Sequence, residues 1–150
     1  MNLSHEGGDA LRDMRVALDV EIPSDVSYIE RVVALVTREC SALHLTPRQC
    51  ALNVPVALTE AISNAILRGN REDAGKHVRV RACVDDTRLV LEVTDEGEGF
   101  DIEQCVIDPT TPDQIEREDG RGLFLMQRLM DRVERFSSSG NVLRLTLNRR

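Results

Sequence analysis

Glu60 and Asn64 carry side chains suited to proton transfer and metal binding, and they stand four residues apart in the sequence. On a helix this spacing places both side chains on one face. A carboxylate can orient or deprotonate an attacking hydroxyl group, while an amide oxygen is a suitable ligand for Mg2+ and can also contact phosphates. A solvated helix face would show the same pair, but the neighbours at helical spacing are small and leave room for a ligand: Ala57, Ala61 and Ala65.

Asp95 closes an apolar stretch and is followed by Gly97 and Gly99. Its carboxylate can accept a hydrogen bond from the exocyclic amine of adenine, a group that guanine lacks at that position. The two glycines allow the backbone to approach a ligand closely and to take positive φ angles. A strand-ending turn that requires glycine is the alternative, so this group alone leaves both interpretations open.

Gly120, Arg121 and Gly122 stand where an acidic segment gives way to a helical pattern. Free backbone N–H groups at a helix N-terminus form an anion site without a lysine. Arg121 could add a positive charge to bound phosphates or face a partner protein, and the glycines could equally act as the hinge of a lid. A P-loop is excluded because the only lysine, Lys76, is followed by His77 instead of Ser or Thr.

Hydrophobic periodicity predicts the elements that carry these groups. Strands are expected at residues 14–22, 78–84, 89–93, 133–136 and 142–147, and helices at 25–43, 46–69 and 122–131. The second helix begins with a capping box, in which Thr46 is the N-cap, Pro47 the first helical residue and Gln49 the reciprocal partner. Pro55 lies inside this helix and removes a backbone hydrogen bond, so a kink or a break is expected there.

The order of these elements predicts the organisation of the chain. Residues 1–12 are expected to form a flexible N-terminal tail and residues 13–150 a single domain. Residues 101–119 are charged and lack periodicity, so they are expected to be disordered or to form a functional lid. The expected fold class is α/β, a two-layer α/β sandwich with helices on one face of a mixed, mainly antiparallel sheet.

The composition favours a function carried out in a pocket, without direct contact to nucleic acid or a membrane. Aromatic residues make up 3% of the chain and the net charge is -7, which argues against stacking on bases and against a general footprint for a phosphate backbone. The sequence indicates no N-terminal apolar segment, no long apolar span and no CxxC pair. Cys40 and His44 could share a helix face, but no second pair completes a metal site. A cytoplasmic protein with reduced thiols is therefore expected.

Three motifs occur in a fixed order along the chain. They are Glu60-Ala61-Ile62-Ser63-Asn64-Ala65, Asp95-Glu96-Gly97-Glu98-Gly99-Phe100 and Gly120-Arg121-Gly122-Leu123-Phe124. Together they resemble the N box and the two successive G boxes of the GHKL ATPase superfamily. From about residue 14 to the C-terminus, the chain is most similar to the small anti-sigma-factor serine kinases of the RsbW and SpoIIAB type. This resemblance implies the Bergerat ATP-binding fold, with ATP and Mg2+ as cofactors.

The resemblance also implies a role for each matching residue. Glu60 corresponds to the proposed general base, Asn64 to the Mg2+ ligand and Asp95 to the residue that recognises adenine. The implied ATP-binding residues are Asn64, Arg68, Asp95, Gly97, Gly99, Gly120, Arg121, Gly122, Leu123 and Phe124. Arg68 departs from the family pattern, which often has His-Gly at this point, and is expected either to contact phosphate or to be a surface arginine.

By this resemblance the chain is expected to be an ATP-dependent serine/threonine protein kinase and anti-sigma factor in a partner switch. Such a protein holds a sigma factor in one state and phosphorylates a STAS-domain antagonist, an anti-anti-sigma factor, in the other. Members of the group are commonly homodimers. Two alternatives stay open: a nucleotide-gated binding module without effective phosphoryl transfer, and a regulator whose sequestered target is not a sigma factor.

Overall fold

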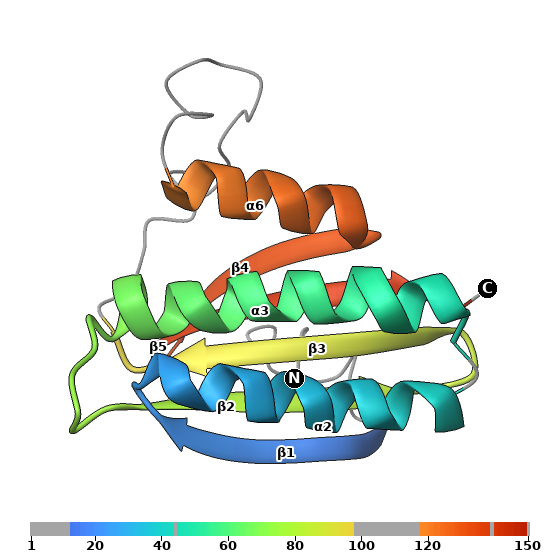
Figure 1. Cartoon of the computed structure of the whole chain (residues 1–150), viewed down its shortest axis with the longest axis horizontal. Helices are drawn as coiled ribbons and strands as arrows, with labels where there is room; N and C mark the ends of the chain where they lie inside the picture. The colour runs from blue at the N-terminus through green and yellow to red at the C-terminus, as the bar shows by residue number, and fades with distance from the viewer. Residues whose placement is uncertain (1–12, 44, 98–117, 139, 150) are drawn as a thin grey trace, which may run out of the picture.

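One antiparallel sheet forms the base of the molecule (Figure 1). The computed structural model describes residues 13–43, 45–97, 118–138 and 140–149. The strands are β1 (Arg15–Pro23), β2 (His77–Val84), β3 (Arg88–Asp95), β4 (Arg132–Ser138) and β5 (Gly140–Asn148). Their order in the sheet is β1-β2-β3-β5-β4, and every neighbouring pair is antiparallel. The predicted strands are therefore confirmed to within a few residues at their ends.

The expectation of a mixed sheet is wrong for the described strands. The chain leaves β3 and returns through a helix to β4, a connection that usually produces a parallel pair. Here β5 folds back into the space between β3 and β4, and it runs antiparallel to both. The position of β5 therefore removes the parallel contact that the element order allowed.

Helices cover one face of this sheet, as predicted. In the described part of the chain the α-helices are α2 (Ile29–Ala42), α3 (Val54–Asn64) and α6 (Glu118–Leu129). A short 3-10 turn, η2 (Val26–Tyr28), precedes α2, and π-helical turns extend α3 at both ends, η3 (Gln49–Asn53) and η4 (Ala65–Gly69). Figure 1 shows α2 and α3 lying side by side across the sheet, with α6 next to α3.

The capping box at the start of the second predicted helix is present in the structure. The Thr46 backbone N–H donates to Gln49 Oε1 at 3.0 Å, and the Gln49 backbone N–H donates to Thr46 Oγ1 at 3.1 Å. Gln49 Nε2 also donates to the backbone oxygen of Asn148 at 2.8 Å. The start of this helix is thereby fixed to the end of β5.

Pro55 does not break the helix, which continues from η3 through α3 to η4 (Figure 1). The residue lies in the first turn of α3, and the five residues of η3 before it adopt π-helical hydrogen bonding. A π-helical turn changes the pairing of backbone donors and acceptors, and so accommodates a residue that has no N–H. Pro55 therefore changes the local hydrogen-bonding pattern while the helix runs on.

The third predicted helix begins earlier than expected, at Glu118 instead of residue 122, and ends at Leu129. Acidic residues are favourable in the first turn of a helix, which explains why this acidic sequence joins the helix. Asn53 Nδ2 donates to the backbone oxygen of Leu129 at 2.6 Å and ties the end of α6 to η3. Most of the predicted lid, residues 101–117, lies outside the described residues, as does the predicted tail.

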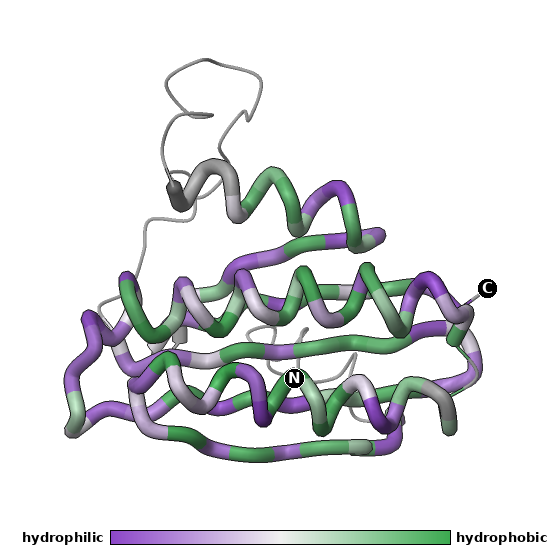
Figure 2. Tube along the Cα trace, in the orientation of Figure 1, coloured by the Kyte–Doolittle hydropathy of each residue, from purple (hydrophilic) through white to green (hydrophobic). Residues whose placement is uncertain are grey.

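The core fills the space between the helices and the sheet. In Figure 2 hydrophobic residues recur along α3 and along the strands behind it. The largest fully buried side chains include Leu58, Ile62, Leu91 and Leu145. The segment Gln49–Gly69 is long and apolar enough to cross a membrane by length and composition, contrary to the expectation of no long apolar span. Its buried side chains belong to the core, which accounts for its apolar composition.

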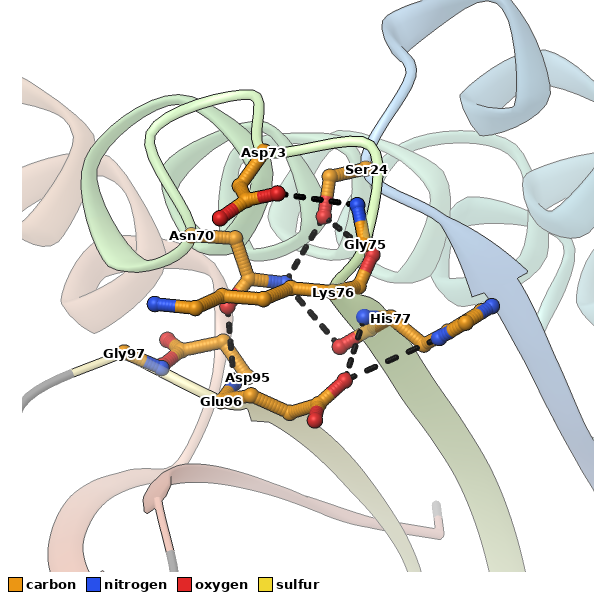
Figure 3. Close-up of polar contacts among 9 residues, drawn as sticks. All are labelled: Ser24, Asn70, Asp73, Gly75, Lys76, His77, Asp95, Glu96 and Gly97. Atoms are coloured by element: carbon orange, nitrogen blue, oxygen red, sulfur yellow. Dashed lines mark hydrogen bonds and ion pairs between the residues drawn. The ribbon is translucent and has the colours of Figure 1, made fainter.

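A polar cluster around Asn70 joins the ends of several elements (Figure 3). The Asn70 side chain is buried, and its Nδ2 donates to Ser24 Oγ at 2.8 Å and to the backbone oxygen of His77 at 2.9 Å. Its Oδ1 accepts a hydrogen bond from the Glu96 backbone N–H at 2.7 Å. Ser24 Oγ donates in turn to the backbone oxygen of Lys76 at 2.7 Å. One amide therefore connects the end of the long helix to β1, β2 and β3.

Replacing Asn70 with alanine should lower the free energy of unfolding by about 2–4 kcal/mol, because Ser24, His77 and Glu96, at the ends of three strands, would each lose a hydrogen-bond partner. Urea denaturation of the parent protein and the variant measures this difference. Asp73→Ala is the matched control, since Asp73 is exposed and its side chain accepts from Gly75 N–H in a surface turn. An Asn70→Ala variant no less stable than the Asp73→Ala variant would contradict the role given to Asn70.

Candidate functional site

A pocket opens where the end of the long helix meets the ends of β3, β4 and β5. Its lining residues are Ala61, Asn64, Ala65, Arg68, Val93, Asp95, Arg135, Asn141, Val142 and Leu143. Alanines and aliphatic side chains form much of the wall. The polar residues Asn64, Asp95 and Asn141 belong to α3, β3 and β5, respectively. An apolar pocket with a few fixed polar groups is the usual form of a small-molecule site.

Asp95 is the buried acidic group of this pocket, with 5% of its surface exposed. Its Oδ1 accepts hydrogen bonds from Gly97 N–H at 2.8 Å and from Asn141 Nδ2 at 2.9 Å. Burial raises the pKa of Asp95 above its ordinary value, while the hydrogen bonds from Asn141 and Gly97 and the charge of Arg135 oppose that rise. Both donors hold the same oxygen, so the carboxylate has a fixed orientation.

Gly69 and Gly97 bring the end of the helix into direct contact with the end of β3. A Cβ atom on Gly69 would lie 2.2 Å from Asp95 Oδ2, and one on Gly97 would lie 2.0 Å from the backbone oxygen of Gly69. Neither distance is compatible with a side chain, because real Cβ atoms do not approach other atoms so closely. Gly97 is therefore required by close packing within the protein, besides any approach to a ligand.

Glu60 and Asn64 lie one helical turn apart on α3, as the sequence predicted, and both are half-buried. The start of α6 rests on them: a Cβ on Gly122 would be 3.1 Å from Glu60 Oε2 and 3.3 Å from Asn64 Nδ2. Asn64 lines the pocket and Glu60 lies beyond it. The buried Nδ2 of Asn64 has no hydrogen-bond partner within the part of the chain that the structure describes. An unpaired buried amide is costly, and a bound ligand is one way to satisfy it.

The structure brings some of the other predicted residues to the pocket and leaves others away from it. Arg68 lines the pocket although much of the residue is exposed. Leu123 is buried in the core, whereas the ring of Phe124 is exposed and lies 5.6 Å from the guanidinium of Arg128. Gly99 lies outside the described residues.

The earlier start of α6 changes which backbone groups could hold an anion. A helix leaves its first four N–H groups without partners inside the helix. The last of these four groups belongs to the third helical residue, Gly120, so its N–H remains in the expected anion site, while the N–H groups of Arg121 and Gly122 fall outside it. Gly122 instead provides the close contact between α6 and the Glu60–Asn64 pair.

Sequence reasoning missed Gly69, Asn70, Arg135 and Asn141 as site residues. Gly69 was visible only as a helix-ending glycine, and Asn70 follows it directly. Asn141 reaches the site because β5 pairs with β3 in a register that places it opposite Asp95. Arg135 reaches the pocket because it pairs with Leu143 on β5, which also lines the pocket. Strand register across a long connection has no local sequence signal, so these two residues could not be assigned.

Comparison with known proteins identifies the type of domain. Residues 22–147 match the model of the histidine kinase-like ATPase domain. The serine-protein kinase RsbW of Bacillus subtilis is 31% identical over 135 residues, which cover 86% of this chain and 83% of that protein. The anti-sigma F factor of Clostridium acetobutylicum is 31% identical over 100 residues, covering 65% of this chain and 68% of that protein.

Solved structures show the same fold at low sequence identity. The catalytic domain of the histidine kinase ThkA aligns with a TM-score of 0.56 and 12% identity, covering 88% of this chain and 97% of that one. The mycobacterial sensor histidine kinase MprB aligns with a TM-score of 0.54 and 16% identity, covering 89% of this chain and 99% of that one. At this level of identity, the likeness establishes the architecture.

The raised pKa of Asp95 predicts a specific pH dependence of stability. The folded protein binds this proton more tightly than the unfolded chain, so the carboxyl group increasingly destabilises the fold as pH rises from its ordinary pKa of 3.8 through the raised value. An Asp95→Asn variant lacks this effect, so its stability relative to the parent should increase over the same interval and then level off. Urea denaturation without ligand, from about pH 4 to pH 8, measures the difference.

Asp86→Asn is the control for this measurement, because Asp86 is an exposed residue of the β2–β3 turn. Its stability difference from the parent should not follow the pattern seen for Asp95→Asn. If the stability of Asp95→Asn relative to the parent fell with rising pH, the burial of an ionising carboxyl group at Asp95 would be disproved.

Proposed function

We infer the function from the family to which this chain belongs, the histidine kinase-like ATPases, and propose that it is an ATP-dependent serine/threonine protein kinase of the RsbW type. The observation that carries the proposal is the placement of three groups along one surface. Asp95 and Asn64 line the same pocket, and Glu60 lies outside it, one turn from Asn64 on α3. This order matches a base, a triphosphate and an attacking hydroxyl group.

Adenine recognition is assigned to Asp95. Its Oδ1 is held by Gly97 and Asn141, so Oδ2 is the oxygen proposed to accept a hydrogen bond from the exocyclic amine. The aliphatic side chains of Val93 and Leu143 provide apolar surface for the ring. The N-terminal turn of α6 is proposed to bind phosphate through free N–H groups, among them that of Gly120, and Arg121 to add a positive charge. Arg68, which also lines the pocket, is proposed to contribute a positive charge.

Asn64 is the proposed Mg2+ ligand. Its side chain provides an amide oxygen, and its buried Nδ2 lacks a partner in the described residues, so the site fits a metal–phosphate ligand. The ion would neutralise phosphate charge during transfer. Glu60 would accept the proton of the partner's hydroxyl group as that oxygen attacks the γ-phosphorus. The bond between the γ-phosphorus and the bridging oxygen breaks, and ADP leaves.

The partner assignment follows from the relatives. Proteins similar to this chain carry the names serine-protein kinase and anti-sigma F factor. We therefore propose a cytoplasmic, homodimeric partner switch that sequesters a sigma factor and phosphorylates a STAS-domain antagonist. Incubation of candidate STAS proteins with this protein and Mg-ATP, followed by mass spectrometry, tests the assignment. A phosphorylated serine or threonine supports the kinase, whereas nucleotide-dependent target binding without any phosphorylation would replace it with a binding module.

Asp95→Asn should weaken ATP binding about 10- to 100-fold, because the variant misplaces a donor and leaves the adenine amine without its acceptor. The parent protein should bind ATP well and GTP poorly. Isothermal titration calorimetry measures both affinities, with Asp86→Asn as the exposed control. Equal ATP affinity in the parent and the Asp95→Asn variant would exclude Asp95 as the adenine acceptor.

Glu60→Gln keeps the shape of the side chain but removes its basicity, so it should lower phosphorylation of a confirmed partner by roughly 10²- to 10⁴-fold while Mg-ATP affinity stays within a few-fold. Asn64→Ala should instead weaken Mg-ATP binding itself. Glu30→Gln, on the exposed surface of α2, is the control and should retain the parent rate. Phosphorylation at the parent rate by Glu60→Gln would show that Glu60 is not the base.

A further inference from the structure

Arg135 lines the pocket, but the proposed function assigns it no task. It lies on β4, which is separated from β3 by one strand. Leu143 on β5 pairs with Val93 on one side and with Arg135 on the other, so these three residues form a row across the sheet. Asp95 lies two residues farther along β3 and on the same face of the sheet as Val93. Because neighbouring strands are about 4.8 Å apart, β4 lies about 10 Å from β3, and Arg135 and Asp95 line the same pocket from these two strands.

The electrostatics agree with this placement. Burial raises the pKa of Asp95, and the charge of Arg135 is among the influences that lower it. Arg135 is half-buried and lines the same pocket as Asp95, so its charge acts on the carboxylate across that pocket. The two groups therefore present opposite hydrogen-bonding characters to the same space, since a carboxylate only accepts and a guanidinium only donates.

Two other arginines of the sheet, Arg79 and Arg144, lie on the face opposite to Arg135. Arg79 donates two hydrogen bonds to Asp19 at 2.9 and 2.7 Å, and Arg144 donates two to Glu92 at 2.9 and 2.7 Å. The alternation of each strand directs these arginines to the face away from the helices. Arg135 is on the helix-facing side and borders the apolar residues Val93 and Leu143.

On the premise of the proposed function, we propose that Arg135 donates a hydrogen bond to a ring nitrogen of adenine beside the exocyclic amine that Asp95 binds. That amine is flanked by two accepting nitrogens, N1 and N7. Asp95 and Arg135 together complement the donor and acceptor on this edge. Guanine has a carbonyl oxygen in place of the amine, which faces the Asp95 carboxylate unfavourably. Arg135 is thus a specificity residue that reads a second position of the base.

Base analogues test this proposal directly. In 1-deaza-ATP and 7-deaza-ATP, a C–H group replaces N1 or N7, so the purine keeps its shape and loses one acceptor. The parent protein should bind one of the two analogues about 10- to 100-fold more weakly than ATP, the usual effect of losing a hydrogen bond to a charged group. Isothermal titration calorimetry with the full chain gives each affinity. Equal affinities of the parent for ATP and both analogues would overturn the proposal.

The Arg135→Met variant completes a cycle with the same nucleotides. It should bind ATP about 10- to 100-fold more weakly than the parent, and the analogue that the parent discriminates should then bind as well as ATP. Arg135→Lys keeps a donor and should recover part of the discrimination. Arg132→Met is the matched control, since Arg132 is an exposed residue of the same strand, and it should behave as the parent.

The outcomes separate this proposal from the proposed function. If Arg135→Met weakened ATP and both analogues by the same factor, the residue would act by stacking or by supporting the fold, and the hydrogen bond would be excluded. If the variant failed to fold, the analogue series on the parent would decide alone. A parent protein that bound no ATP would overturn the proposed function itself, whereas ATP binding without discrimination between analogues would overturn only the role of Arg135.

Discussion

The site depends on how closely the end of the long helix approaches the end of β3. Gly69 and Gly97 meet there with no room for a Cβ atom on either residue. The Asn70 side chain fixes the same junction through the Glu96 backbone N–H, and it also holds Ser24 and His77. Because Glu60 and Asn64 lie on that helix and Asp95 on that strand, this contact sets the distance between the groups that the proposed reaction requires.

The sequence was sufficient wherever the structural signal was local. The reciprocal bonds of Thr46 and Gln49 are present, and the five strands lie within a few residues of the predicted ranges. It was insufficient wherever the outcome depended on distant pairing. The insertion of β5 beside β3, which brings Asn141 to Asp95, follows from packing of the whole sheet. The π-helical turn before Pro55 is likewise an adjustment of the backbone to the missing N–H, and no residue pattern predicts it.

Helix α6 contacts the rest of the site at two separate points. Its last residue, Leu129, is bonded to Asn53 in η3, and its first turns rest on Glu60 and Asn64 through Gly122. The contact at Leu129 joins α6 to the scaffold, whereas the contact at Gly122 joins α6 to the proposed reactive groups. A displacement of the N-terminal half of α6 would alter the surroundings of Glu60 and Asn64 directly, while the bond at Leu129 would keep the helix attached.

The contact between Gly69 and Gly97 also limits how this protein can diverge. Any mutation of either codon that adds a side chain forces the helix and the strand apart, so substitution of either glycine is expected to be excluded. Arg135 and Asn141 impose no such limit, since they reach the pocket through side chains that can be exchanged without moving the backbone. In descendants of this gene, a new base preference is therefore expected to arise on β4 and β5, while the two glycines are inherited unchanged.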